Sequence, residues 1–311
     1  MHIAVTGSRG LIGGAIVAEL AQAGHRVTRV VRGTAEPDQV SWDPEASVFD
    51  ASCLAGVDAV IHLAGESIAR GRWTAAIKER ILASRANGTR VLCEGLARMA
   101  APPAVLVSAS AIGYYGSRGD QLLSEGSEPG DGFLPTVVRE WEAATGPAAA
   151  AGTRVVLARF GVVLSPRGGA LKKMLTPFQL GLGGILGSGR QYLSWIALND
   201  AAGAVHHALA ANTLHGPVNV VAPYPVTNAE FTKTLGRVLG RPTVARVPAF
   251  AARLALGEMA DALLLASTRV HPGQLLASGY PFRCGNLEET LRHLLPSSEG
   301  RAGPSGRRNC R

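Results

Sequence analysis

The sequence predicts an α/β protein built on a doubly wound parallel sheet, with a smaller C-terminal lobe that would hold a substrate. Two observations support this prediction. Short apolar segments rich in β-branched residues alternate with longer segments of helical periodicity through the first half of the chain, which is the pattern of βαβ units. The first apolar segment, residues 2–6, runs into three glycines at G-x-x-G-x-x-G spacing, and an amphipathic stretch follows over residues 11–23.

The glycine-rich turn predicts a dinucleotide site. A strand, a tight turn and a helix N-terminus form an anion site, because unpaired backbone N–H groups and the positive helix end face one spot. The first glycine would allow the turn, the second would allow close approach of a pyrophosphate, and the third would let the helix pack on the strand. We therefore expect the cofactor to contact the whole loop, which consists of Thr6, Gly7, Ser8, Arg9, Gly10, Leu11, Ile12 and Gly13.

The second predicted strand, residues 26–31, ends where an acidic residue would hold the ribose 2′-hydroxyl of NAD. This sequence has Arg32 there, 25 positions after Gly7. A guanidinium at that place, together with Arg9 in the loop, suits a 2′-phosphate through charged, forked hydrogen bonds. The alternative is that both arginines are solvated surface side chains. The pattern favours NADP(H) as the cofactor.

The rest of the chain divides into a core, a lobe and a tail. Further strands are predicted at residues 40–42, 58–63, 104–108 and 154–159, with 217–221 returning to the sheet. Helices are predicted at 11–23, 73–100, 132–151, 195–209, 250–266 and 287–295, and a capping box at 227–230 predicts one more, to residue 239. These elements assign residues 1–160 to the cofactor core, 161–199 and 222–296 to a substrate lobe over the strands' carboxyl ends, and 297–311 to a disordered basic tail.

Composition excludes several classes of protein. The 311 residues are 47 % apolar and 17 % charged, as in a folded globular protein. The net charge of +8 lies partly in the tail and is otherwise dispersed, which argues against nucleic-acid binding. No signal peptide and no uncharged apolar run of about 18 residues is found, so we expect a cytoplasmic protein without membrane contact. The four scattered cysteines argue against a metal site or disulfides.

Two predicted strands end in candidate site residues. Residues 58–63 lead into Leu63, Ala64, Gly65 and Glu66, where small side chains would let the backbone pass under the cofactor. Residues 104–108 lead into Ser108, Ser110 and Tyr115. Ligands of open α/β sheets sit at the carboxyl ends of the strands. We therefore predict cofactor contacts at the first group and Ser108, and catalytic hydroxyls at Ser110 and Tyr115. Ordinary loop capping is the alternative.

Taken together, these segments resemble the extended short-chain dehydrogenase/reductases, the NAD-dependent epimerase/dehydratase superfamily, and within it an atypical branch called epimerase family proteins. The resemblance runs from Met1 to about Leu295. It implies a Rossmann-type sheet, a bound nicotinamide cofactor and a possible homodimer. The matching segments are residues 6–13, 62–68, 84–85, 108–110, 115–116, 141–144, 159–164, 180–184, 195–200 and 228–231.

The chain departs from that superfamily at the residues that move protons. The superfamily uses an asparagine, a serine or threonine, and a tyrosine four residues before a lysine that lowers the tyrosine pKa. Ser110 matches the serine, with Ala111 as a competing register, and the asparagine position falls on Arg85. The tyrosine and lysine positions fall on Phe133 and Val137 or on Leu134 and Val138. The usual Tyr-x-x-x-Lys pair is therefore absent.

Other residues offer substitutes for the missing pair. Tyr114 or Tyr115 would supply a phenol, Lys172, Lys173 or Arg85 a cation, and Glu66 or Glu125 a carboxylate. The preferred catalytic set is Ser110, Tyr115 and Arg85, with Arg85 as the cation that lowers the pKa of the phenol. Two hypotheses follow. One is an NADP(H)-dependent oxidoreductase or epimerase acting on a small molecule, for which Arg85 and Arg159 would suit an anionic group. The other is a catalytically silent NADP(H)-binding sensor or regulatory protein.

Overall fold

The computed structural model describes residues 1–45, 48–69 and 71–295, so the tail predicted at 297–311 lies outside the described residues. Its centre is a seven-stranded sheet with the order β12-β7-β5-β4-β1-β2-β3, in which every neighbouring pair is parallel. All seven predicted strands are present. They are β1 (His2–Thr6), β2 (Arg26–Val31), β3 (Gln39–Ser41), β4 (Ala59–His62), β5 (Val105–Ala111), β7 (Arg154–Phe160) and β12 (Gly216–Val220).

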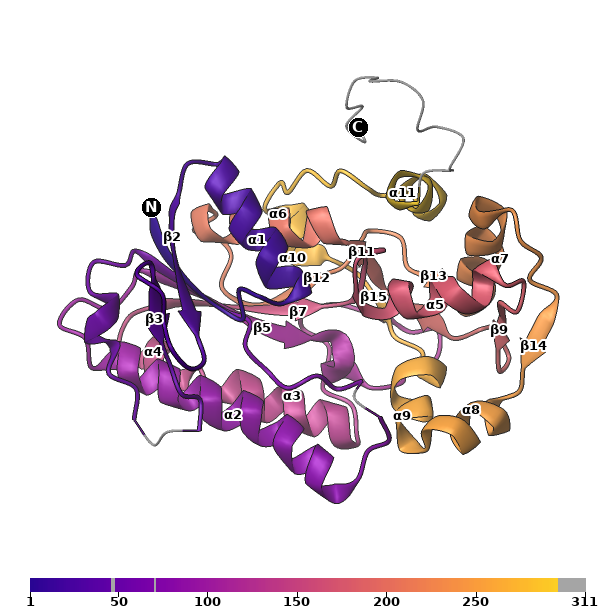
Figure 1. The fold of residues 1–311 in the computed structure, drawn as a ribbon, viewed down its shortest axis with the longest axis horizontal. Helices are drawn as coiled ribbons and strands as arrows, with labels where there is room; N and C mark the ends of the chain where they lie inside the picture. The colour runs from indigo at the N-terminus through magenta and orange to yellow at the C-terminus, as the bar shows by residue number, and fades with distance from the viewer. Residues whose placement is uncertain (46–47, 70, 296–311) are drawn as a thin grey trace.

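Helices cover both faces of this sheet, as Figure 1 shows. One layer contains α1 (Leu11–Gln22), α6 (Leu198–Ala210) and α10 (Gly273–Ala277), and the other contains α2 (Ala75–Ala97), α3 (Phe133–Ala143) and α4 (Gly146–Ala150). The chain builds outward from β1 to β3, then crosses back to β4 on the other side of β1. The predicted doubly wound sheet is thus confirmed, and its strand order reverses beside β1, where such sheets bind ligands.

The strands are apolar because both faces of the sheet are buried. On β1, Ile3 and Val5 pack in one cluster with Ile16 and Leu20 of α1. Ala4, between them, packs in the opposite cluster, which contains residues of α2. A fully buried aliphatic side chain of this size contributes about 1.5–3 kcal/mol relative to exposure. Alternation along the strand therefore holds the two helix layers on opposite faces of one sheet.

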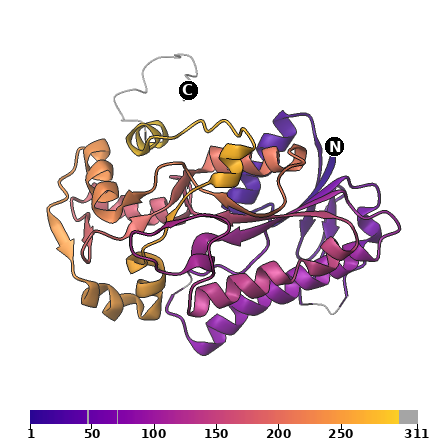
Figure 2. The ribbon, with the colours of Figure 1, turned by 180° about the vertical axis from the view of Figure 1, so that it is seen from behind.

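The remaining segments pair with one another in short two-stranded sheets. These sheets join β8 (Val162–Leu164) to β11 (Trp195–Ala197), β9 (Gly184–Leu186) to β14 (Ala245–Val247), β10 (Tyr192–Leu193) to β13 (Val226–Thr227), and β6 (Leu122–Leu123) to β15 (Arg269–Val270). Their helices are α5 (Gly169–Gln179), α7 (Asn228–Leu239), α8 (Ala249–Leu256), α9 (Glu258–Ala260) and α11 (Leu287–Leu294), with short helices at Ala51–Leu54 (η1), Ile112–Tyr115 (η2) and Asp261–Leu265 (η3). Figures 1 and 2 show α5, α7, α8 and α9 gathered at the end of the molecule toward which β5 points. The division into domains stays a prediction.

Three predicted elements differ in detail. The helix expected over 132–151 is broken into α3 and α4, because Pro147 has no N–H with which to continue α3. Trp195 begins a strand rather than a helix, since residues 195–197 pair with β8. The helix predicted over 250–266 is divided into α8, α9 and η3, because Gly257 has φ of +62°. One helix that was not predicted, α5, lies in the segment 161–199 assigned to the substrate lobe. The capping box at Thr227 and Glu230 is confirmed. Across the described ranges, no helix is long and apolar enough to cross a membrane.

Candidate functional site

The glycine-rich loop is packed so closely that only glycine fits at two positions. Gly7 has φ of +64°, and a Cβ there would lie 2.7 Å from the carbonyl carbon of Leu63. A Cβ on Gly13 would lie 2.2 Å from the carbonyl oxygen of Gly7. The loop therefore lies directly between the end of β4 and the start of α1. At the first residue of α1 no side chain caps the helix, so its N-terminal N–H groups are left for a ligand.

Ser8 gives a second sign of a ligand in this loop. Its side chain is 2 % exposed, and its Oγ has no hydrogen-bond partner among the described residues. A buried hydroxyl without a partner costs about 1–3 kcal/mol. This hydroxyl and the uncapped helix N-terminus together form a small, positively polarised cradle. The residues present thus fit the diphosphate of a dinucleotide.

Thr6 holds the neighbouring loop in place. Its Oγ1 accepts the N–H groups of Leu63 at 3.0 Å and Ala64 at 3.2 Å, and it lies 2.8 Å from Nδ1 of His62. Burial lowers the pKa of His62 to about 4, so the ring is neutral. Because Thr6 Oγ1 already accepts two bonds, its proton goes to Nδ1, and Nε2–H of His62 donates to Thr89. Thr6 is fully buried and supports the site from beneath.

Arg9 and Arg32 lie at one corner of the sheet. Arg9 follows β1, and Arg32 directly follows β2, the parallel neighbour of β1. Both residues therefore lie at the edge of the sheet where the strands have their carboxyl ends. Both side chains are exposed. Nη2 of Arg9 donates to Oε1 of Gln39 at 3.4 Å, at the start of β3. This corner can therefore bring two guanidinium groups to one anion next to the glycine-rich loop.

Ser108, Ser110 and Tyr115 all lie inside the protein. Ser108 donates to the carbonyl of Ala109 at 3.4 Å. The Tyr115 side chain is fully buried, and its hydroxyl donates to Oδ1 of Asn219 at 2.7 Å. The same hydroxyl accepts a hydrogen bond from Nη1 of Arg159 at 3.0 Å. Burial raises the pKa of Tyr115, and the charge of Arg159 only partly opposes this effect. The role of Tyr115 as a proton donor stays a prediction.

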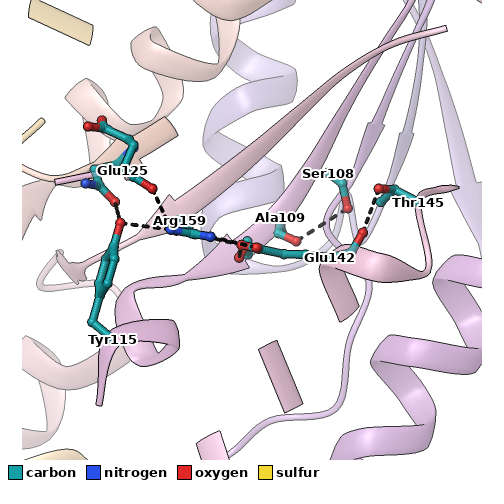
Figure 3. Close-up of polar contacts among 9 residues, drawn as sticks. Ser108, Ala109, Tyr115, Glu125, Glu142, Thr145 and Arg159 are labelled. Carbon is teal, nitrogen blue, oxygen red and sulfur yellow. Dashed lines mark hydrogen bonds and ion pairs between the residues drawn. The ribbon is translucent and has the colours of Figure 1, made fainter. Parts of the chain in front are cut away.

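Glu142 and Arg159 form the centre of this buried polar network (Figure 3). Arg159, on β7, donates Nε–H and Nη2–H to the two carboxylate oxygens of Glu142 on α3, each at 2.8 Å. Their side chains are 2 % and 10 % exposed. Ser110, on β5, donates its hydroxyl to Oε1 of Glu142 at 2.5 Å. The Arg159 guanidinium also stacks on Tyr114, 3.5 Å from the ring centroid. A serine hydroxyl is thereby joined to an oriented carboxylate.

The prediction that Arg85 is the cation beside Tyr115 is wrong. Arg159 occupies that place, because the Tyr115 hydroxyl points toward β7 and β12. Arg85 extends from α2 toward the loop after β4 and stacks on Trp141, with its Cζ 5.1 Å from the ring centroid.

Two of the other suggested substitutes, Glu125 and Lys173, make structural contacts. Oε1 of Glu125 accepts the backbone N–H groups of Asn219 and Gln274, each at 3.1 Å. The Nζ of Lys173 donates to the carbonyl of Ala69. The sequence analysis did not predict Glu142 as the partner of Arg159 or Asn219 as the partner of Tyr115. Because Arg159 lies at the buried end of the strand 154–159, the sequence did indicate that an acidic residue should face it.

Comparisons with known proteins agree with this architecture. The model of the "NAD dependent epimerase/dehydratase family" matches residues 3–222, and that of "Domain of unknown function (DUF1731)" matches residues 247–294. Epimerase family protein Mb2239 of Mycobacterium bovis is 47 % identical over 290 residues, which cover 93 % of this chain and 96 % of that protein. The human epimerase family protein SDR39U1 is 38 % identical over 298 residues, covering 95 % of this chain and all of that protein.

Two solved structures support the same assignment. The crystal structure of human SDR39U1 (isoform 2) with NADPH superposes with a TM-score of 0.87 at 36 % identity, covering 94 % of this chain and 99 % of that one. The nucleoside-diphosphate sugar epimerase of Corynebacterium glutamicum has a TM-score of 0.79 at 38 % identity, covering 95 % of this chain and 58 % of that one. The chain belongs to the NAD dependent epimerase/dehydratase family.

Proposed function

We propose that this protein is an NADP(H)-dependent oxidoreductase or epimerase-type enzyme that acts on a small molecule. The glycine-rich loop and the N-terminus of α1 would hold the cofactor diphosphate, and the orphaned Ser8 hydroxyl would pair with it. Arg9 and Arg32 would bind the 2′-phosphate. The human relative's structure with NADPH supports this choice of cofactor.

The cofactor, when bound, supplies or accepts a hydride, and the protein's own residues must handle the accompanying proton. The usual tyrosine and lysine would stand on α3 at 133 and 137 or at 134 and 138, where this chain has apolar residues. Glu142 lies one helical turn beyond Val138, on the same helix face. Unlike those residues, it carries a carboxylate and reaches the end of β5.

The observation on which this mechanism rests is the 2.5 Å hydrogen bond from Ser110 Oγ to Glu142 Oε1. In the direction of oxidation, a substrate hydroxyl would give its proton to Ser110 Oγ while Ser110 passes its own proton to Glu142. The bound oxidised nicotinamide would accept the hydride from the carbon that carries this hydroxyl, so a carbonyl would form. Reduction reverses each transfer. The two bonds from Arg159 keep the carboxylate oriented toward the serine.

A catalytically silent NADP(H)-binding sensor is the second candidate. The observation that favours it is the complete burial of Tyr115, whose hydroxyl already has two protein partners. In that case the polar network would only join α3 to β5, β7 and β12, and no hydride would be transferred. Cytoplasmic location and homodimer formation remain proposals for either candidate.

Turnover with defined substrates separates the two functions. The protein is incubated with NADPH or NADP⁺ and a panel of small carbonyl and hydroxyl compounds, and the absorbance of the reduced nicotinamide is followed. Ser110→Ala removes the hydroxyl but leaves the Glu142–Arg159 pair intact. We expect it to lower the rate by about 10²- to 10⁴-fold, as for a lost proton-transfer group, with unchanged cofactor affinity. Tight NADPH binding without turnover on any compound would favour the sensor.

A further inference from the structure

The guanidinium of Arg85 is held at the carboxyl end of β4 between two fixed surfaces. The loop after β4 is tied to α2, since the N–H of Glu66 donates to Oγ of Ser84 at 3.1 Å. Within that loop, a Cβ on Gly65 would lie 3.5 Å from Arg85 Cζ, so the loop backbone lies against the guanidinium. On the other side, Trp141 of α3 offers its ring face. The position of Arg85 is therefore determined by two elements other than its own helix.

Arg85 has few partners for its N–H groups. A guanidinium carries five N–H donors, and the one hydrogen bond of Arg85 in the described structure runs from Nη1 to the carbonyl of Ile81 at 3.3 Å. None of the ion pairs found between described residues includes Arg85. Burial lowers its pKa to about 10, with the nearby charge of Glu66 opposing the shift, so it stays a cation near neutral pH.

Two other arginines of the described structure have more hydrogen-bond partners than Arg85. Arg159 has a bidentate carboxylate partner in Glu142. Arg154 donates to three backbone carbonyls at the end of α6 and in the loop after it. Trp141, the platform of Arg85, has a buried indole N–H with no partner among the described residues. In the described structure, Arg85 therefore keeps N–H donors without a protein partner, and so does the ring on which it stacks.

We infer that Arg85 binds the carboxylate or phosphate group of the substrate, with Trp141 as the platform that orients the guanidinium. The inference rests on the proposed function, because it places this group beside the cofactor loop. A guanidinium edge matches the two oxygens of either anion. The substrate rather than the cofactor supplies the anion, since Arg9 and Arg32 follow β1 and β2, while Arg85 lies between the loop after β4 and Trp141 of α3.

Footprinting tests this site directly. The protein is treated with phenylglyoxal, with and without NADPH, in the presence of malonate, inorganic phosphate or chloride at equal ionic strength, and labelled arginines are located by mass spectrometry. Malonate or phosphate should lower labelling of Arg85 at least fivefold relative to chloride in both states. The exposed Arg90, on the same helix, is the control and should be unaffected. Equal labelling of Arg85 in all three salts would overturn the inference.

Two further outcomes are decisive. Loss of Arg85 labelling with NADPH alone, without added effect of malonate, would assign the anion to the cofactor and overturn the substrate assignment. Protection by malonate in a protein that calorimetry shows not to bind NADPH would support the anion site and overturn the proposed function.

Variants of Arg85 give a second test. Arg85→Gln should weaken malonate binding more than tenfold and change the NADPH dissociation constant less than twofold. Arg85→Lys should bind malonate with an affinity between those of Arg85→Gln and the parent. A tenfold loss of NADPH affinity in Arg85→Gln would contradict the inference.

Discussion

The two ends of the site are built in different ways. At the β1–α1 corner, the ligand site is formed mainly by the backbone, with two glycines that leave no room for a Cβ and a helix N-terminus without a side-chain cap. The one side-chain group added there is the buried Ser8 hydroxyl, which has no partner among the described residues. At the ends of β5 and β7 it offers side chains, and nearly all of them are already paired with one another. The first region is shaped for a ligand by local sequence. The second is a closed network, whose chemistry depends on partners brought from distant segments.

The largest expected effect comes from breaking the closed network. Glu142→Gln removes the charge that compensates Arg159 and leaves a buried guanidinium with a neutral partner. Loss of one member of a buried ion pair costs about 3–5 kcal/mol. We expect a fall of this size in the free energy of unfolding, measured by urea denaturation. Glu140→Gln, on the exposed face of the same helix, is the matched control and should change stability by less than about 0.5 kcal/mol. If both variants unfold with the same free energy, the Glu142–Arg159 ion pair does not stabilise the fold.

His62, which is hydrogen-bonded to Thr6 beneath the cofactor corner, should make the stability of the protein depend on pH. The folded-state pKa of His62 is lowered from 6.5 to about 4 by burial. As the pH falls below 6.5, the unfolded state takes up a proton that the folded state does not, so stability is lost between pH 6.5 and about 4. The loss from this group is about 3.5 kcal/mol, since one pKa unit corresponds to about 1.4 kcal/mol.

This dependence is measured as the free energy of unfolding at several pH values. His62→Gln should flatten the slope between pH 6.5 and about 4, although the variant itself starts from a lower stability. His215→Gln, at an exposed histidine, is the control and should keep the parent slope. A parent slope that matches His62→Gln would show that His62 titrates normally in the folded protein.

A smaller change in stability, together with a change in NADPH affinity, is expected when one of two neighbouring glycines of the cofactor corner is replaced by alanine. In Gly13→Ala the new Cβ would meet the carbonyl oxygen of Gly7 at 2.2 Å, so the loop must move. Overpacking of this kind costs about 1–3 kcal/mol. Gly14→Ala is the matched control, because its Cβ would lie 3.8 Å from the nearest atom, the carbonyl oxygen of Ser8. That variant should gain about 0.5–1 kcal/mol of helix stability. Calorimetry with NADPH should show lost affinity only for Gly13→Ala.

The strands and the glycine-rich turn of the first region were predicted from the sequence, because their determinants are local. The strands, the glycine spacing and Arg32 at the end of β2 can each be read within a few residues of one another. The second region could not be predicted in this way. Tyr115 and its acceptor Asn219 are 104 positions apart, and only the sheet order brings β5 and β12 to the two sides of β7. Arg85 was misplaced for the same reason, since periodicity places it on a helix but does not show which strand end it faces.

Calorimetric titration with NADPH and with NADH tests the proposal that the β1–α1 corner binds NADP(H) through Arg9 and Arg32. Each charge-assisted bond to the 2′-phosphate is worth about 1.5–3 kcal/mol. The parent should therefore bind NADPH more tightly than NADH by at least about tenfold, and Arg32→Asp should erase or reverse that preference. Arg26→Asp makes the same charge change at the opposite end of β2 and should keep the preference. Equal affinities for the two cofactors in the parent protein would show that Arg9 and Arg32 do not bind the 2′-phosphate.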